Sequence, residues 1–113
     1  MIFRCYLLKI YEGKCIITNN SCEDELSACH IIPVSHEGDY SNNNGLLMTH
    51  NLHSTFDKFM WSINPDTMMI EIDSSKNAHT IKNYQDIKIN INMNPFLYIN
   101  LKWHYNQYQS KCL

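Results

Sequence analysis

The chain of 113 residues lacks the features that mark membrane and secreted proteins. No apolar run approaches the roughly 20 residues that are needed to cross a bilayer. The first residues include Arg4 and Lys9 and form neither a continuous apolar stretch nor a small-residue cleavage site, so the pattern of a secretory signal is missing. We therefore expect an intracellular protein, of the cytoplasm, nucleus or nucleoid, with no membrane partner.

The five cysteines lack any close Cys-x-x-Cys pair, and their number is odd. A framework of disulfides is therefore not expected. Cys15 and Cys22 flank a turn and, with Cys29 and His30, would make a set of four zinc ligands, although their spacing matches no standard zinc module. A structural zinc site and free buried thiols both remain open.

Positive charge is also scarce, because nine Lys and Arg stand against 11 Asp and Glu and give a net charge of −2. A protein that binds a polyanion usually carries an excess of positive charge, so binding to any polyanion would depend on a local patch. The candidates for such a patch are Arg4, Lys9, Lys14 and Lys58. We expect such binding to be weak and easily screened by salt unless dimerisation or a partner adds to it.

The chain does have a globular composition, with 44% hydrophobic and 18% charged residues, in a length that suits one modest core. We expect a single α+β domain over residues 1–113, with a central motif at 26–59 and a C-terminal extension at 60–113. Before the motif, apolar residues at spacings of three and four predict a helix over 3–12 that ends at Gly13. A short strand is expected at 15–18.

The extension has the patterns of a hairpin, a strand and a helix. Apolar runs on both sides of the turn at 64–67 predict two antiparallel strands at 60–63 and 68–72. The apolar and polar alternation at 87–91 predicts a half-buried strand. A helix is expected from Pro95 to about Gln109, with Asn94 as its N-cap.

The central motif has the pattern of strand, loop, strand and helix. Residues 27–32 form a short β-branched run that ends at Pro33, and a turn-rich loop separates it from a second run at 46–48. A helix should follow, because Thr49 is a good N-cap and apolar residues recur at helical spacing. The residues of that apolar face are Leu52, Phe56 and Phe59.

The same helix carries a pair of residues that suits a metal ion. His53 and Asp57 are four positions apart, so their side chains project from one stripe away from the apolar face. An imidazole and a carboxylate at this spacing can share a divalent ion. Cys29 or His30, on the first strand, supplies a third candidate ligand.

Three separated segments together resemble the HNH endonucleases of the ββα-metal, or His-Me finger, fold. They occur in order with compatible spacing, which makes the resemblance more specific than one short pattern. Upstream residues from Phe3 to Thr18 also match, so the similarity covers about the first 65 residues. The three segments are Ala28-Cys29-His30-Ile31, Asn44-Gly45-Leu46-Leu47 and His53-Ser54-Thr55-Phe56-Asp57.

The resemblance implies a metal-dependent DNA endonuclease that hydrolyses phosphodiester bonds. By this resemblance His30 is the general base, Asn44 orients the loop and the His30 ring, and His53 and Asp57 hold one divalent ion. Lys58, where relatives often carry Arg, is a candidate phosphate ligand. The implied partner is double-stranded DNA, and a homodimer is the simplest way to cut both strands.

Cys29 departs from the familiar pattern, in which the residue before the general base is often a metal-binding Asp or His. A thiolate favours zinc or another soft metal, whereas Mg²⁺ and Mn²⁺ prefer oxygen. The resemblance favours Mg²⁺ or Mn²⁺ and leaves Zn²⁺ and Ni²⁺ open, with Cys29 either a ligand or a bystander. The alternative function is a non-catalytic ββα or zinc module that serves as an adaptor for DNA or protein.

Overall fold

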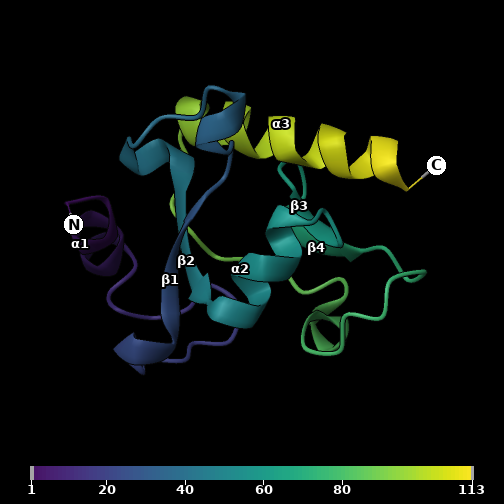
Figure 1. Cartoon of the computed structure of the whole chain (residues 1–113), viewed down its shortest axis with the longest axis horizontal. Helices are drawn as coiled ribbons and strands as arrows, with labels where there is room; N and C mark the ends of the chain where they lie inside the picture. The colour runs from purple at the N-terminus through teal and green to yellow at the C-terminus, as the bar shows by residue number, and fades with distance from the viewer. Residues whose placement is uncertain (1, 113) are drawn as a thin grey trace.

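The computed structural model describes residues 2–112 and shows an α+β fold. Figure 1 shows a two-stranded hairpin with one helix on each side and a long helix across one end. No helix in residues 2–112 combines the length and the apolar character that crossing a bilayer requires. The helices and strands are α1 (Ile2–Ile10), β1 (Leu26–His30), β2 (Gly45–Thr49), α2 (His50–Asp57), β3 (Trp61–Asn64), β4 (Met69–Ile72) and α3 (Pro95–Lys111). Short 3-10 turns are η1 (Glu23–Glu25), η2 (Val34–His36), η3 (Asn42–Asn44) and η4 (Ile81–Tyr84).

The predicted strand, loop, strand and helix of the motif are confirmed. β1 and β2 pair in antiparallel register from Leu26 opposite Thr49 to His30 opposite Gly45. α2 follows β2 directly and packs on the hairpin through its buried Leu52 and Phe56. Thr49 occupies the N-cap position, but its side chain makes no capping hydrogen bond. Tertiary packing of the apolar face, more than the cap, therefore holds this short helix.

The predicted N-terminal helix is also confirmed, and it packs against both strands of the hairpin. Gly13, at φ +68°, closes the helix by donating its N–H to the carbonyl of Leu8 at 2.7 Å. Arg4 donates to the carbonyl of Leu26 at 2.6 Å and ties the helix to the start of β1. The closest approach is at Gly45, where a Cβ atom would lie 2.6 Å from the Leu7 side chain. Only glycine lets the helix come this close to β2.

The strand predicted at 15–18 is wrong, because this segment forms a turn. The buried Cys15 sulfur accepts the N–H groups of Ile17 and Thr18, both at 3.5 Å. The N–H of Ile16 instead donates to the carbonyl of Leu47 at 3.0 Å. These contacts satisfy the backbone locally, so the β-propensity of the Ile pair does not decide the conformation.

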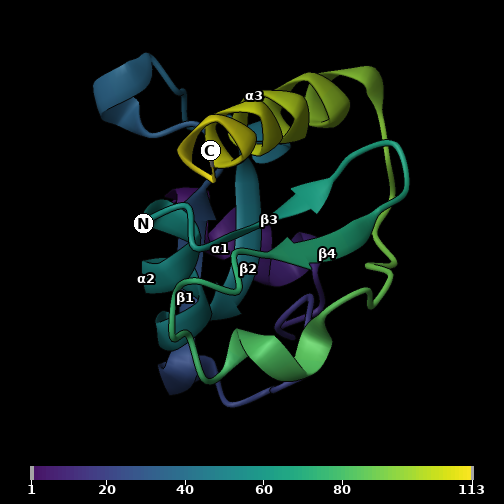
Figure 2. The ribbon, with the colours of Figure 1, turned by 90° about the vertical axis from the view of Figure 1, so that its right-hand side faces the viewer.

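In the extension, the predicted hairpin and final helix are confirmed. β3 and β4 pair from Trp61 opposite Ile72 to Asn64 opposite Met69. The Asn94 side chain accepts the N–H groups of the second and third residues of α3, as expected of an N-cap. Figure 2 shows α3 lying across the β3–β4 hairpin, and α3 contacts β3 directly.

The strand predicted at 87–91 is reduced to a single bridge between Lys88 and Met69. Ile89 is buried, but Ile87 is 46% exposed, so the alternation does not produce a continuous inner face. The paired edge is short because Met68, at φ +60°, turns the chain just before β4. Asp86, at φ +63°, turns it on the other side.

A buried histidine for which the sequence suggested no role joins the extension to the motif. His104 Nε2 donates to the carbonyl of Phe56 at 2.9 Å, and Nδ1 lies 2.7 Å from the Ser62 hydroxyl. Its ring stacks on that of Phe56 with centroids 3.5 Å apart. Since the carbonyl can only accept, the neutral ring donates there and accepts from Ser62. Burial lowers the pKa of His104 to about 4.

The loop between β1 and β2 is held by Asn44, whose side chain is buried. Its amide oxygen accepts the N–H of Ile32 at 2.8 Å. Its amide nitrogen donates to the carbonyls of Ile32 at 3.0 Å and Asp39 at 2.9 Å. One side chain thus fixes both ends of the loop that follows His30.

His104 should make the protein less stable in acid. The unfolded chain takes up a proton near pH 6.5, whereas the folded chain resists protonation of His104 until about pH 4. Between these values the free energy of unfolding should fall by roughly 3 kcal/mol from this group alone. Urea unfolding across this pH range should show a shallower fall in His104→Gln. The exposed His79→Gln is the control and should keep the wild-type slope; equal slopes for all three proteins would contradict the assignment.

Replacing Asn44 by Ala should destabilise the protein by about 2–4 kcal/mol, since three partly buried hydrogen bonds to the backbone of Ile32 and Asp39 are lost. The matched variant Asn42→Ala removes an exposed amide from the same 3-10 turn and should change stability by less than about 0.5 kcal/mol. The free energy of unfolding from urea titration checks both. Equal effects of the two variants would show that the amide of Asn44 does not hold the loop.

Candidate functional site

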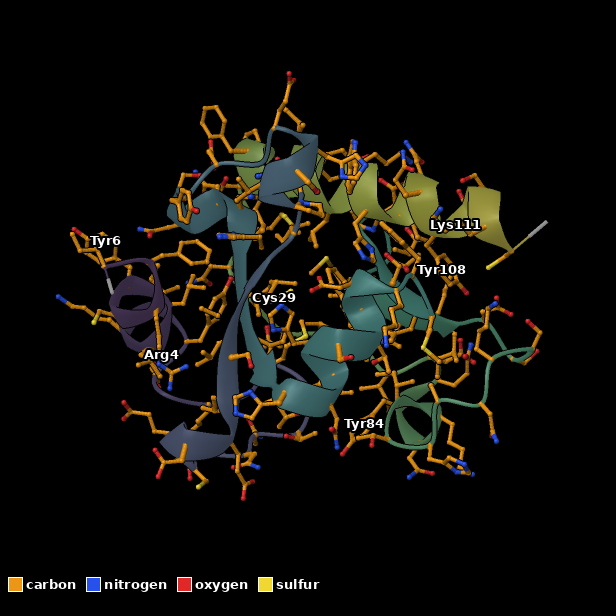
Figure 3. The ribbon with its side chains drawn as sticks, in the orientation of Figure 1. Arg4, Tyr6, Cys29, Tyr84, Tyr108 and Lys111 are labelled. Atoms are coloured by element: carbon orange, nitrogen blue, oxygen red, sulfur yellow. The ribbon has the colours of Figure 1, made fainter. Side chains whose placement is uncertain are left out.

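Three possible metal ligands meet where β1 packs on α2. Ligand atoms of Cys29, His53 and Asp57 all lie within 4.8 Å of one another. The Cys29 sulfur is 4.0 Å from Asp57 Oδ1, and His53 Nε2 is 3.1 Å from Asp57 Oδ2. Figure 3 shows Cys29 in the interior, between the β1–β2 hairpin and α2.

The local structure explains why these three side chains converge. Residues three apart on a strand face opposite sides, and both faces of β1 are covered, by α1 and by α2 (Figure 1), so Leu26 and Cys29 are both buried. On α2, His53 and Asp57 are one turn apart and lie beside the buried Leu52 and Phe56. Anchoring the helix through its apolar residues therefore brings the polar pair to the Cys29 sulfur.

The donor set fits a divalent metal ion. Bonds of about 2.0–2.3 Å to one ion place ligand atoms roughly 3–4 Å apart, and the 3.1 Å and 4.0 Å separations agree with this. Cys29 is fully buried, whereas the side chains of His53 and Asp57 are 29% and 48% exposed. The sulfur thus closes the site from inside, and the outer side is open to solvent and to a substrate.

The ionisation of Cys29 is strongly affected by this position. Burial, and then the negative charge of Asp57, raise its pKa well above the usual thiol value. The side chain is therefore a neutral thiol unless a cation lies beside it. Binding of a divalent ion would release this proton, as is general for thiolate ligands.

His30, the predicted general base, lies beside the donor cluster and is not part of it. Its ring stacks on Phe3 with centroids 4.2 Å apart and meets the edge of Tyr40 at 4.8 Å. Burial lowers the pKa of His30; the charge on His53 acts in the same direction, and Asp57 and Asp39 oppose the shift. The ring is therefore neutral near pH 7 and able to accept a proton. Within residues 2–112, its buried Nδ1 has no hydrogen-bond partner.

The other predicted site residues occupy different positions. Asn44 bonds to the backbone of the loop, and its side chain makes no hydrogen bond to the His30 ring. Lys58 follows α2 immediately, is exposed and forms no ion pair in the part of the chain that the structure describes. Arg4, from the predicted basic patch, donates hydrogen bonds to the carbonyls of Glu23 and Leu26.

Neither Cys15 nor Cys22 joins a group of three possible ligands within residues 2–112. The Cys15 sulfur is used by backbone N–H groups, and Cys22 is exposed at the start of η1. The set of four zinc ligands considered from the sequence is therefore not assembled. Cys29 instead lies beside His53 and Asp57 of α2.

Sequence reasoning missed three residues that support the site. Phe3 and Tyr40 hold the His30 ring, and His104 bonds to the carbonyl that immediately precedes Asp57. The sequence did place Phe3 on the apolar face of the predicted N-terminal helix, which indicated that it packs against the rest of the protein. Tyr40 and His104 had none, since their contacts join segments far apart in the sequence.

Comparison with known families agrees with this geometry. Residues 15–64 match the family model described as HNH endonuclease. No curated protein matches the chain at a significant level. The matched residues span β1, the loop closed by Asn44, β2, α2 and β3, which include the ββα unit and the three converging ligands. Over this segment, the chain is similar to the HNH endonuclease family.

Proposed function

We propose that the protein is a metal-dependent DNA endonuclease that hydrolyses phosphodiester bonds. The observation that carries the proposal is the convergence of ligand atoms from Cys29, His53 and Asp57 beside the neutral ring of His30. A general base next to a site for a divalent ion is the minimum that this hydrolysis needs. The match of residues 15–64 to the HNH endonuclease family model supports the same reaction class.

In this proposal His30 removes the proton from the water that attacks phosphorus. Its lowered pKa keeps the ring neutral at physiological pH, and Phe3 and Tyr40 restrict its orientation. Asn44 acts as a positioning residue, because it fixes the loop that leaves β1 directly after His30. The buried Nδ1 of His30 has no hydrogen-bond partner within residues 2–112, so no group in that part of the chain competes for a proton at this atom.

His53 and Asp57 would hold the ion from the exposed side, and Cys29 would approach it from the interior. A divalent ion supplies neutralisation of the charge that develops on the phosphate and on the leaving 3′ oxygen. The exposure of His53 and Asp57 allows a phosphate to approach from solvent. His30 lies near enough to both residues for their charges to affect its pKa.

Double-stranded DNA is the proposed substrate, bound through a small number of cations. Lys58 lies just beyond Asp57, and Lys111 lies 5.3 Å from the ring centre of Phe59, so both positive charges border the end of α2. With a net charge of −2, binding should be weak and salt-dependent. A homodimer would double these contacts and present two sites to two strands.

We also propose that residues 1–113 form one domain. The extension does not stand apart from the motif, because His104 of α3 hydrogen-bonds to Phe56 of α2. α3 also contacts η3, which carries Asn44. The helix α2, which carries His53 and Asp57, is thus held by the C-terminal extension.

A second candidate function is a non-catalytic zinc module that serves as an adaptor for DNA or protein. The observation that favours it is Cys29, since thiolate ligands are typical of structural zinc sites. Against it, only three ligands converge within residues 2–112, and the side facing solvent stays open. Closed structural sites usually have four protein ligands. Activity towards DNA separates the two functions.

The proposal predicts nicking of supercoiled plasmid in the presence of a divalent ion, tested with Mg²⁺, Mn²⁺, Ni²⁺ and Zn²⁺. His30→Ala should lower the rate about 10²–10⁴-fold, the usual loss for a general base. It should not abolish metal binding, measured by calorimetry, because His30 is not a ligand. The exposed His79→Ala serves as the control and should nick at the wild-type rate. Undiminished nicking by His30→Ala would exclude it as the base.

The ion should also stabilise the fold through His53 and Asp57. At a free metal concentration about 100 times the dissociation constant, the free energy of unfolding should rise by about 2.7 kcal/mol. Chelation should remove this gain and the nicking activity together. The double variant His53→Ala/Asp57→Ala should show neither gain nor nicking, whereas Asp86→Asn, an exposed carboxylate elsewhere, should behave as wild type. A gain retained by the double variant would place the ion at another site.

A further inference from the structure

We propose that Cys29 ligates the ion as a thiolate and thereby makes this centre selective for Zn²⁺ or Co²⁺ over Mg²⁺. This inference rests on the metal site of the proposed function and specifies the class of ion that it takes. The resemblance by itself favours Mg²⁺ or Mn²⁺ and leaves Cys29 either a ligand or a bystander. The position of the Cys29 sulfur in the structure argues otherwise.

The first argument is that the Cys29 sulfur has unused lone pairs. Within the described residues, Cys29 acts only as a weak donor, to the carbonyl of His30 at 3.5 Å and to Asp57 at 4.0 Å. Cys15, the other buried cysteine, provides the comparison, because its sulfur accepts two backbone N–H groups. The lone pairs of Cys15 are therefore occupied by the protein, whereas those of Cys29 accept no hydrogen bond and lie beside two other ligands.

The second argument is geometric. A catalytic zinc site has three protein ligands in a roughly tetrahedral arrangement and a fourth position open to water or substrate. Cys29, His53 and Asp57 are three ligands of the types that zinc prefers, and the exposed side next to His53 and Asp57 provides the fourth position. Mg²⁺ demands six oxygen ligands in near-octahedral geometry and has little affinity for sulfur.

The third argument concerns charge. A thiolate of Cys29 and the carboxylate of Asp57 carry two negative charges, and His53 contributes a neutral nitrogen. One divalent ion makes this set neutral, which removes the cost of a buried, unpaired thiolate. Replacing the sulfur by the neutral hydroxyl of Ser would leave one uncompensated positive charge at the buried side.

The experiment uses a background protein in which Cys5, Cys22 and Cys112 are replaced by Ser, because these three thiols are exposed and would bind metal nonspecifically. Titration with Co²⁺ should produce an intense thiolate-to-cobalt charge-transfer band in the near ultraviolet. Zn²⁺ should remove the band, and excess Mg²⁺ should not. Adding Cys29→Ser to the background should abolish the band and weaken Zn²⁺ binding more than about tenfold, which is 1.4 kcal/mol.

Since Cys29 is buried and its variant could unfold, a second measurement needs no substitution at this position. X-ray absorption of the zinc-loaded background protein should show one sulfur ligand at about 2.3 Å, together with nitrogen and oxygen ligands. Adding Cys15→Ser provides the matched control, because its sulfur is also buried but does not belong to the ligand set, and it should keep the sulfur signal.

The possible results separate this inference from the proposed nuclease. A missing sulfur signal, or displacement of Co²⁺ by an equal concentration of Mg²⁺, would overturn the thiolate ligand. Plasmid nicking with Mg²⁺ and no sulfur signal would overturn it while leaving the nuclease intact. A sulfur signal without nicking in any metal would support the thiolate ligand and reject the nuclease.

Discussion

The packing of α2 against the β1–β2 hairpin is the contact on which the site depends. Burial of Leu52 and Phe56 sets the helix at a fixed distance and rotation relative to β1. His53 and Asp57 then have one direction in which to point, and the Cys29 sulfur lies there. Because a rotation of one residue on a helix is about 100°, any slip of α2 would separate the carboxylate from the sulfur. The apolar contact thus determines the polar geometry.

Segments outside the ββα unit keep this contact in place and set the state of its ionisable groups. α1 approaches β2 closely at Gly45 and supplies Phe3 to the His30 ring, and α3 holds the last turn of α2 through His104. Burial lowers the pKa of both histidines and raises the pKa of Cys29. The same shielding from water therefore keeps His30 neutral. It also keeps Cys29 a neutral thiol unless a cation lies beside it.

Local patterns predicted most of the secondary structure. The central strand, loop, strand and helix, the hairpin around residues 64–67 and the helix starting at Pro95 follow from periodicity, turn residues and caps, which act over a few neighbours. The two wrong strand predictions have different causes, one local and one tertiary. Residues 15–18 form a turn because the Cys15 sulfur takes the nearby N–H groups. Residues 87–91 pair at only one position because the available edge of β4 is short.

The sequence by itself determined the order and types of the elements, the resemblance to HNH endonucleases and the pairing of His53 with Asp57 on one face of a helix, because each depends on spacing along the chain. Only the tertiary structure decided that Cys29 joins this pair, that Tyr40 contacts the His30 ring and that His104 is a buried link. Spacing cannot predict such contacts, since they depend on the relative placement of segments that the packing of the whole core brings together.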